Sequence, residues 1–279
     1  MTVLSQLYIS VENILASLTP SVSPSPEAGL PATNLTDSKR NKVCRVTGSP
    51  DPIVITAGSG TQYTMGCFAL WGWNFASDVT VRIRLYSEDG QTGSVVYDST
   101  ALTPHVIIPW GDMLYGPDPW GDVYTTAPPE LYAVFFDEVV AKSYQVDIVN
   151  PTATSVDIGL IFGGWAWTPT INMDLGQWTD HIDDSKQTRT AGAGLVTQAV
   201  DSYKHIGWSL SRMPKTDRET LAHLLETAGK DSDILMSLDP TETTRELIEN
   251  QMICRRVSNN RATRSGLSFR STSVEFAEI

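Results

Sequence analysis

The stretch that decides the fold class reads Val79-Thr80-Val81-Arg82-Ile83-Arg84-Leu85-Tyr86. Apolar residues occupy the odd positions, and polar or amphipathic residues occupy the even ones. Successive side chains of a β-strand point to opposite faces of the sheet, so this alternation is typical of a strand with one buried face. We therefore expect the four aliphatic side chains to point inward, and Thr80, Arg82, Arg84 and Tyr86 to point outward.

Further short apolar runs, separated by turn residues, lie on both sides of this strand. They are Ile53–Thr56, Cys67–Trp73, Ser94–Tyr97, Leu131–Phe136, Tyr144–Val149 and Ser155–Phe162. Many short strands at this spacing are typical of two packed antiparallel sheets. The sequence therefore predicts a mainly β protein, in which residues 33–165 form a jelly-roll-like β-sandwich.

Two domains are expected, because 279 residues exceed the usual size of one domain. Residues 1–32 are interpreted as an N-terminal arm or linker, since 18–32 contain four prolines together with Ser and Gly. Residues 166–279 are expected to form a second, smaller β-rich domain. Its strands are predicted over 203–210, 234–238, 252–257 and 267–276.

One helix is predicted near 216–229 of this second domain. Thr216 and Glu219 have the spacing of a capping box, and Gly229 supplies a left-handed stop. The expected buried face consists of Leu221, Leu224, Leu225 and Ala228. Residues 241–250 fit either a short helix or a loop.

The first 18 residues carry seven large aliphatic side chains from Leu4 to Leu18, but the segment is too short to build a core. Such a surface left in water would be costly. We expect them to dock on the second domain or on an adjacent copy, with the closing strand 267–276 as a partner for strand addition. On this view, deleting residues 1–18 leaves the sandwich folded.

Composition excludes several classes of partner. The formal net charge of −12 disfavours a surface that grips nucleic acid, which needs many Lys or Arg on one face. Residues 1–18 lack the layout of a signal peptide, and no run reaches the ~18 apolar residues of a membrane-spanning helix. Cys44, Cys67 and Cys254 lack metal-site spacing and are interpreted as reduced, buried thiols.

Several segments together resemble a protein family. They are Leu30-Pro31-Ala32-Thr33-Asn34-Leu35-Thr36-Asp37, Val43-Cys44-Arg45-Val46-Thr47-Gly48, Ala69-Leu70-Trp71-Gly72-Trp73-Asn74-Phe75, residues 79–86, Val96-Tyr97-Asp98-Ser99, Gly159-Leu160-Ile161-Phe162-Gly163-Gly164-Trp165, Asp183-Asp184-Ser185 to Gly192, and Ser237-Leu238-Asp239-Pro240. This set resembles the sandwich domain of tail and minor structural proteins of long-tailed bacteriophages. Cys44 stands where an aromatic residue is common in that family.

The resemblance implies a structural component of a phage virion tail, at the tail tip, the baseplate or a distal tail adaptor. Such a protein is synthesised in the host cytoplasm and assembles in symmetric copies with itself and with neighbouring tail proteins. The alternative function is a carbohydrate-binding module that recognises host surface glycans, because similar sandwiches also bind sugars and fold alone does not fix function.

An aromatic loop interrupts the strand pattern between Pro109 and Pro129 and contains two Pro-Trp-Gly-Asp units. Trp110, Tyr115, Trp120 and Tyr124 could stack on sugar rings while nearby carboxylates accept hydrogen bonds from hydroxyls. They could equally pack on a neighbouring subunit, which we favour because the loop offers no metal or base to orient a ligand.

Two charged segments have less specific interpretations. Arg255, Arg256, Arg261 and Arg264 could contact an acidic partner, or form an ordinary solvent face. The string 178–185 has oxygen and imidazole donors, but it lacks the order of a calcium loop and is interpreted as a solvated turn between domains.

No enzymatic activity, cofactor or metal site is expected. The sequence contains no nucleophile elbow, phosphate loop or His-Glu-x-x-His motif. Asp137 and Glu138 are adjacent, so on a strand they would point to opposite faces and could not share one substrate.

Overall fold

The computed structural model describes residues 6–39, 41–48, 51–105, 131–149, 154–190, 193–242, 245–258, 263–264 and 270–279. The fold is mainly β, and the chain forms two compact units. Unit 1 contains Met1–Thr168 and Asp233–Ile253, and unit 2 contains Pro169–Ser232 and Cys254–Ile279. This division differs from a single boundary near residue 165, because residues 233–253 return to unit 1.

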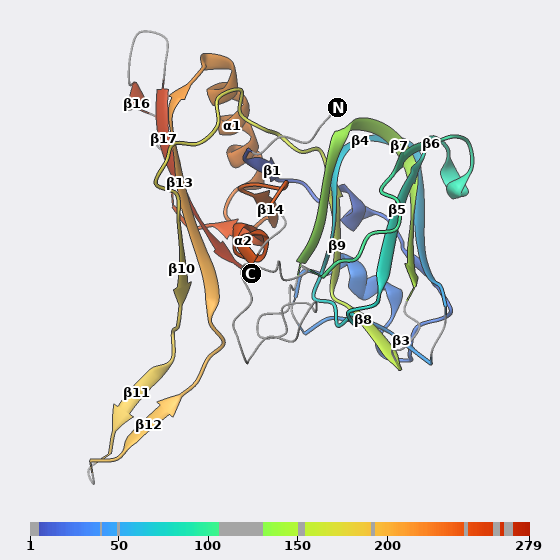
Figure 1. Cartoon of the computed structure of the whole chain (residues 1–279), viewed down its shortest axis with the longest axis horizontal. Helices are drawn as coiled ribbons and strands as arrows, with labels where there is room; N and C mark the ends of the chain where they lie inside the picture. Colours follow the sequence, from blue (N-terminus) through green and yellow to red (C-terminus); the bar gives the residue numbers. More distant parts are fainter. Residues whose placement is uncertain are drawn as a thin grey trace. The chain divides into compact units, whose positions relative to one another are not determined.

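Unit 1 is built on a six-stranded antiparallel sheet (Figure 1). Its strand order is β2-β4-β7-β5-β6, and β9 also pairs with β4. The strands are β2 (Ser21–Ser23), β4 (Ile53–Trp71), β5 (Thr80–Tyr86), β6 (Val95–Asp98), β7 (Leu131–Val149) and β9 (Leu160–Gly164). A separate antiparallel pair consists of β3 (Cys44–Thr47) and β8 (Ser155–Ile158).

Strands β4 and β7 are longer than the sequence predicts. Each joins two of the expected short runs into one strand of 19 residues. The two strands pair with each other along most of their length, with register shifts between Gly58 and Tyr63 and between Met65 and Cys67. Such irregularities bend a strand without ending it, which explains why turn-like residues lie inside these elements.

The predicted alternation in β5 is confirmed for its inward face. Val79, Val81, Ile83 and Leu85 have no solvent exposure. Tyr86 is the exception on the outward side, since its exposed fraction is only 7%. The core that β5 faces also receives side chains from β3 and β8, and it includes Cys44, Val46, Val156 and Ile158.

The N-terminal arm belongs to unit 1. Strand β1 (Tyr8–Ser10) pairs with β14 (Ile234–Ser237), whose neighbour on the other side is β15 (Gln251–Arg256). Leu15 and Leu18, in and after the short 3-10 helix η1 (Ile14–Ser17), are buried in the sandwich core. The arm therefore fills a core within its own unit, and its strand pairs with β14, whereas we expected the closing strand to be its partner.

The Asn13 side chain joins this arm by hydrogen bonds to β9 of the six-stranded sheet. Its side-chain amide donates to the Ile161 carbonyl at 3.0 Å, and its amide oxygen accepts a hydrogen bond from the Gly163 N–H at 3.1 Å. Two further 3-10 helices, η2 (Ala32–Thr36) and η3 (Asp89–Gln91), complete the connections of unit 1 together with the α-helix α2 (Arg245–Asn250). Residues 241–250 fitted either a short helix or a loop, and the structure shows a helix over Arg245–Asn250.

The strands of unit 2 belong to a seven-stranded sheet that also includes β1 and β14. Here the strand order runs from β15 to β17 (Arg270–Glu278), β13 (Tyr203–Met213) and β10 (Trp178–Ile182), and β16 (Thr263–Arg264) also pairs with β17. Strand β15 starts in unit 1 and ends in unit 2. Strand β10 shows that residues 178–182 pair with β13 and are not the turn that we expected.

Helix α1 (Lys215–Ala228) confirms the predicted helix and its buried face. The predicted capping box is wrong, because the N-cap is Pro214, two residues before Thr216, and no side chain caps the helix. Asp217 is buried instead, and its carboxylate accepts hydrogen bonds from the N–H and hydroxyl of Thr170 at 2.8 and 3.1 Å. Gly229 is the C-cap of the helix, with a positive φ of +63° that favours glycine, but its ψ of −142° is not the left-handed helical conformation that we expected.

A two-stranded hairpin follows β10 in unit 2. It consists of β11 (Lys186–Arg189) and β12 (Leu195–Gln198), which pair only with each other among the described strands. The carboxylate of Asp183 accepts a hydrogen bond from the Ser185 N–H at 2.8 Å, and the Ser185 hydroxyl accepts one from the Val200 N–H at 3.0 Å. The Ser185–Val200 bond joins the two segments that enter and leave the hairpin.

All three cysteines are free and buried. Burial raises the pKa of the Cys44 and Cys67 thiols to about 11. Cys67 Sγ donates to the Gly164 carbonyl at 3.3 Å. The thiols of Cys44 and Cys67 therefore behave as core groups and are poor nucleophiles at neutral pH. Within the described ranges, no helix has the length and apolar character that crossing a membrane requires.

Candidate functional site

The aromatic loop cannot be placed from the structure. Trp110, Tyr115, Trp120 and Tyr124 lie in 106–130, outside the described residues. Their assignment to a sugar or a subunit stays a prediction.

The outer face of β5 and its neighbours carries a network of polar side chains. Arg82 lies opposite Asp147 of β7, and Arg84 lies opposite both Gln145 of β7 and Asp98 of β6. Because every second residue of a strand points to the same face, these side chains share the side of the sheet that faces away from the core. Three adjacent strands thus present planar, hydrogen-bonding side chains side by side.

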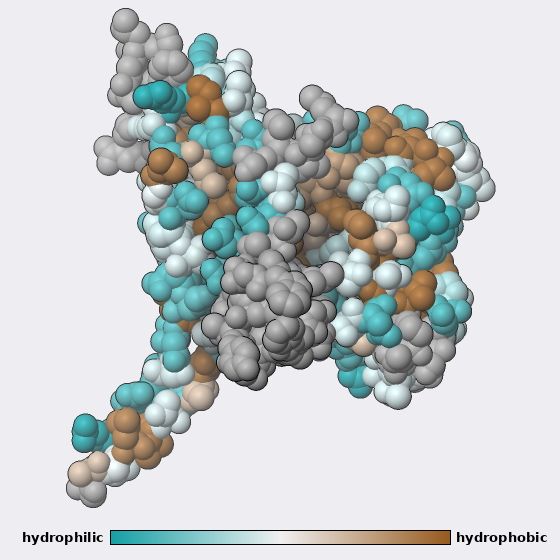
Figure 2. All heavy atoms as spheres, in the orientation of Figure 1, coloured by the Kyte–Doolittle hydropathy of each residue, from teal (hydrophilic) through white to brown (hydrophobic). Residues whose placement is uncertain are grey.

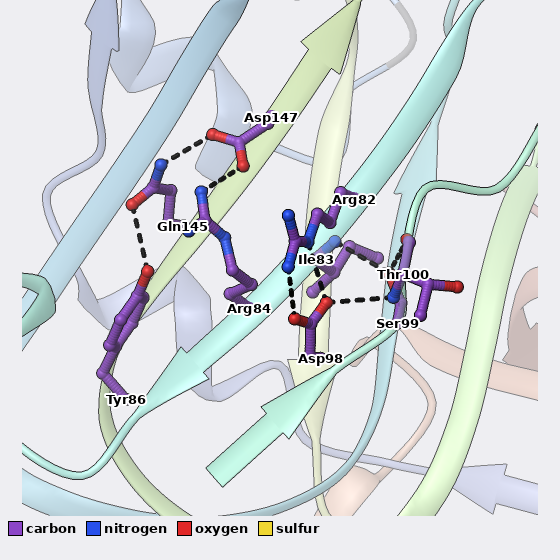
Figure 3. A network of polar contacts seen from close by, with 9 residues as sticks. All are labelled: Arg82, Ile83, Arg84, Tyr86, Asp98, Ser99, Thr100, Gln145 and Asp147. Atoms are coloured by element: carbon purple, nitrogen blue, oxygen red, sulfur yellow. Dashed lines mark hydrogen bonds and ion pairs between the residues drawn. The ribbon is translucent and has the colours of Figure 1, made fainter. Parts of the chain in front are cut away.

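Two ion pairs cross this face diagonally (Figure 3). The Arg82 guanidinium donates from Nε and Nη2 to the two carboxylate oxygens of Asp98, at 2.9 and 2.6 Å. Arg84 forms an ion pair with Asp147. Bidentate pairing fixes the orientation of both planes, so Arg82 and Asp98 are held in one geometry.

Gln145 and Tyr86 extend the second ion pair into a chain. The side-chain amide of Gln145 donates to Asp147 at 2.6 Å, and its amide oxygen accepts a hydrogen bond from the Tyr86 hydroxyl at 3.3 Å (Figure 3). The hydroxyl of Tyr86 therefore has a polar partner, which offsets the cost of burying this residue at an outward position.

The two ion pairs differ in solvent exposure. The Arg82 and Asp98 side chains are 44% and 32% exposed, whereas those of Arg84 and Asp147 are 23% and 16% exposed. The hydrogen bonds from Arg82 hold the pKa of Asp98 below its usual range, and the Thr100 N–H adds a further bond at 3.0 Å. Asp98 also raises the pKa of Arg82. Both groups therefore stay charged at neutral pH.

Sequence reasoning found only part of this site. The alternation placed Arg82 and Arg84 outward, but it gave no partner for either arginine. Asp98, Gln145 and Asp147 come from strands 16 to 63 residues away, as the separations of the Arg82–Asp98 and Arg84–Asp147 pairs show. The available signal was that Asp147 and Gln145 also alternate with apolar residues in their own strand.

The arginine-rich segment is not one patch in the described residues. Arg255 and Arg256 are consecutive in β15 and point to opposite faces, and they lie opposite Ala277 and Phe276 of β17. Arg264 of β16 lies opposite residue 270, six residues earlier in β17. Six residues of strand span about 20 Å, so these arginines are well separated along β17. Arg261 lies outside the described residues.

Within the part of the chain that the structure describes, no three His, Cys, Asp or Glu side chains are placed to hold a metal ion. Asp180 of the acidic string instead accepts a hydrogen bond from the His181 N–H at 2.9 Å. The string divides into strand β10 and the start of the hairpin.

Neither a protein-family model nor a curated protein matches the chain. Among solved structures, chitosan-binding module 1 from a chitosanase/glucanase of Paenibacillus sp. IK-5 is 18% identical, covers 55% of this chain and 98% of its own, and has a TM-score of 0.39. A Streptococcus pneumoniae fucose binding module is 13% identical over 55% and 94%, with a TM-score of 0.38. The family 32 carbohydrate-binding module of NanJ from C. perfringens, solved with galactose, is 12% identical over 59% and 100%, with a TM-score of 0.37.

These three proteins are carbohydrate-binding domains according to their descriptions. At such identities and TM-scores the likeness assigns no ligand to the present chain. The proposal below rests on the geometry of the polar face.

Proposed function

We propose that the protein is a non-catalytic binding protein whose sandwich unit recognises glycans. The polar outer face of β5, β6 and β7 carries this proposal. It presents two guanidinium groups, two carboxylates and one amide whose planes are held by mutual hydrogen bonds.

The chemistry of this face fits sugar hydroxyl groups. A hydroxyl both donates and accepts, so neighbouring hydroxyls of one ring can bond to a carboxylate and to a guanidinium or amide placed beside it. Arg82 and Asp98 supply such a pair, and they are the most exposed members of the face. Because their geometry is already fixed, a ligand orders little on binding. The face is open to water, so we expect weak binding, with a Kd of about 0.1–1 mM.

The test is a glycan array on the full chain, followed by titration of any positive sugar by NMR. Arg82→Lys keeps the charge but removes the planar fork, and it should weaken binding about tenfold. Arg45→Lys is the matched control, because Arg45 forms the same bidentate pair with Asp157, at 2.6 and 2.7 Å, between β3 and β8. That control should bind like the wild type.

The same experiment tests the aromatic loop as the alternative glycan-binding site. A Trp110→Ala, Trp120→Ala double variant should bind normally if the sheet face is the site. Loss of binding in that variant with no effect of Arg82→Lys moves the site to the loop. A wild-type protein that binds no glycan on a broad array rules out the function itself.

A second candidate function is a structural component of a phage tail, located in the virion. The exposed hairpin β11–β12 favours it, because such a surface is typical of a protein that is covered in an assembly. Co-purification of the chain with tail particles supports this function. Recovery of the chain only as a free protein, never in particles, contradicts it.

A further inference from the structure

The hairpin of β11 and β12 buries none of its strand residues. All four residues of each strand are exposed. Leu195, Val196 and the following Val200 have exposed fractions of 55%, 57% and 53%. An isolated two-stranded hairpin is at best marginally stable in water, and exposed apolar area costs about 25 cal/mol per Å². The hairpin is therefore better suited to a covered position than to free solvent.

The hairpin is also cationic. Residues 185–200 contain Lys186 and Arg189 and no acidic residue, although the whole chain has a formal charge of −12. Because Lys186 pairs with Gln198, and Arg189 pairs with Leu195, the two cations lie on opposite faces of the ribbon. In Figure 1 the hairpin is the yellow ribbon below β10. Figure 2, in the same orientation, shows hydrophobic residues on this hairpin.

The segment before the hairpin has the opposite charge. Residues 171–184 contain Asp174, Asp180, Asp183 and Asp184 and no Lys or Arg. The same segment exposes apolar side chains: Ile171 is 40% exposed, Leu175 100% and Trp178 41%. Strand β10, which belongs to this segment, ends the strand order of unit 2, so one side of β10 has no strand neighbour among the described residues.

The Trp178 side chain is partly exposed, and its ring packs on Gly207 and His205. A Cβ atom on Gly207, its partner across the β10–β13 pair, would lie 2.4 Å from the Trp178 ring. The indole therefore lies directly over the backbone of Gly207. His205 packs edge-on against it, with ring centroids 5.0 Å apart. An aromatic ring that is fixed and still exposed loses little entropy when a partner covers it.

Exposed apolar residues are concentrated in unit 2. It contains seven of the eleven large exposed apolar side chains found among the described residues, although it is the smaller unit. Six of the seven lie between residues 171 and 200: Ile171, Leu175, Trp178, Leu195, Val196 and Val200. One stretch of chain thus holds two surfaces with exposed apolar groups and opposite charge.

We propose that the hairpin of one copy docks on segment 171–184 of a second copy of this chain. One face of the ribbon carries Lys186 with Val196, and the other carries Arg189 with Leu195. Whichever face docks, one cation then faces the aspartates and one aliphatic side chain covers Trp178 and Leu175. The contact joins two different surfaces, so each copy can donate its hairpin to one neighbour and accept a hairpin from another. Two copies that exchange hairpins reciprocally form a closed dimer, whereas donation to a different neighbour each time builds a ring or a filament.

The first experiment measures the mass of the full chain by light scattering and sedimentation up to about 100 µM, a range that detects micromolar association. The wild type should form species larger than a monomer. Lys186→Glu with Arg189→Glu should be monomeric, and its circular dichroism should be unchanged because neither side chain is buried. Lys215→Glu with Lys230→Glu is the control, since it makes the same charge change at exposed positions of unit 2 outside both surfaces.

The second experiment tests the acceptor surface. Asp180→Lys with Asp183→Lys should also be monomeric alone. Mixing it with the hairpin variant places a negative hairpin against a positive acceptor, and a positive hairpin against a negative acceptor. Large species should therefore reappear only in the mixture, with the two variants alternating.

A monomeric wild type overturns the proposal, and so does an oligomer that survives the hairpin reversal. An oligomer that the hairpin variant abolishes but the mixture fails to restore shows that the hairpin docks elsewhere, which refutes the acceptor surface. Assembly only in the presence of a different protein assigns the hairpin to that partner and also overturns self-association. None of these outcomes depends on glycan binding.

Discussion

Strands β5 and β12 contain similar side chains and use them in opposite ways. In β5 the aliphatic residues Val81, Ile83 and Leu85 have no exposure, whereas in β12 Leu195 and Val196 are more than half exposed. The difference lies in the pattern, because β5 alternates apolar with polar residues and β12 places two apolar residues side by side. Adjacent apolar residues in a two-stranded ribbon point to both faces. A ribbon of this kind cannot bury both faces against one core.

The comparison teaches that strand content alone does not report on stability. Strand β5 packs its aliphatic side chains into the core of its unit, and ion pairs with β6 and β7 organise its polar outer face. The β11–β12 hairpin adds strand but almost no burial to its own unit. The predictions below separate these two contributions.

The largest effect is expected from deletion of residues 1–18. The deletion removes the β1 pairing and the buried side chains of Leu7, Ile9, Leu15 and Leu18. Each such loss costs about 2–5 kcal/mol, and the whole stability of a domain is about 5–15 kcal/mol. Unit 1 should therefore unfold, contrary to the expectation from sequence, as seen by loss of the near-ultraviolet tryptophan signal. Replacing residues 186–198 by a short Gly-Ser turn is the control and should leave that signal intact.

A matched pair of leucines gives the next largest difference. Leu85→Ala in β5 should lower the free energy of unfolding by about 2–5 kcal/mol, because the side chain is completely buried. Leu195→Ala in β12 makes the same chemical change at 55% exposure and should cost less than about 0.5 kcal/mol in a dilute monomer. Urea unfolding of both variants measures the difference. Equal losses would mean that the hairpin is buried in solution.

Gly207→Ala should have a smaller effect on stability, within about 1 kcal/mol, and a larger one on association. The new methyl group displaces the Trp178 ring, which is 41% exposed and can swing outward. The expected result is a shift in tryptophan fluorescence together with a weaker oligomer. A fluorescence shift with unchanged association would remove Trp178 from the acceptor surface.

The smallest expected effect is the pH dependence of the stability that the Arg82–Asp98 pair contributes. The Arg82 hydrogen bonds lower the pKa of folded Asp98, so this pair contributes stability above the unfolded pKa of about 3.9, and the contribution disappears as pH falls through the folded value. The pair is partly exposed, so it is worth less than about 1 kcal/mol. Asp98→Asn should therefore be slightly less stable than the wild type at pH 5, and the two should converge near pH 2. Thermal melts at both values check this, and a difference that persists at pH 2 contradicts it.

The sequence predicted the elements with a clear period, for a physical reason. Strand β5 and helix α1 bury one regular face each, and that regularity is visible in the order of residues. The capping box failed because Thr216 lies inside the helix, and the buried Asp217 bonds to Thr170, a distant partner that no local pattern contains. The fusion of two short runs into β4 and into β7 depends on their mutual pairing, and this is also not local.

The sequence predicted the arginines of the candidate site but not their acidic partners. Arg82 and Arg84 follow from alternation, but their acid partners depend on which strands become neighbours. The hairpin was missed because its strands bury no face, so no period marks them. The expected strap of the N-terminal arm was correct in requiring burial for its leucines and wrong about the strand that pairs with it, since β14 takes that position.

The pairing of β1 with β14 also affects how the chain emerges from a ribosome. Strand β1 is synthesised long before its partner β14 (Ile234–Ser237), which comes much later in the sequence. Throughout that interval β1 has no strand to pair with, and the buried positions of Leu7 and Ile9 are incomplete. Contacts this distant along the sequence form slowly and leave strand edges open to aggregation. Translation pauses before residue 234 should therefore be the moments at which a nascent chain most needs a chaperone.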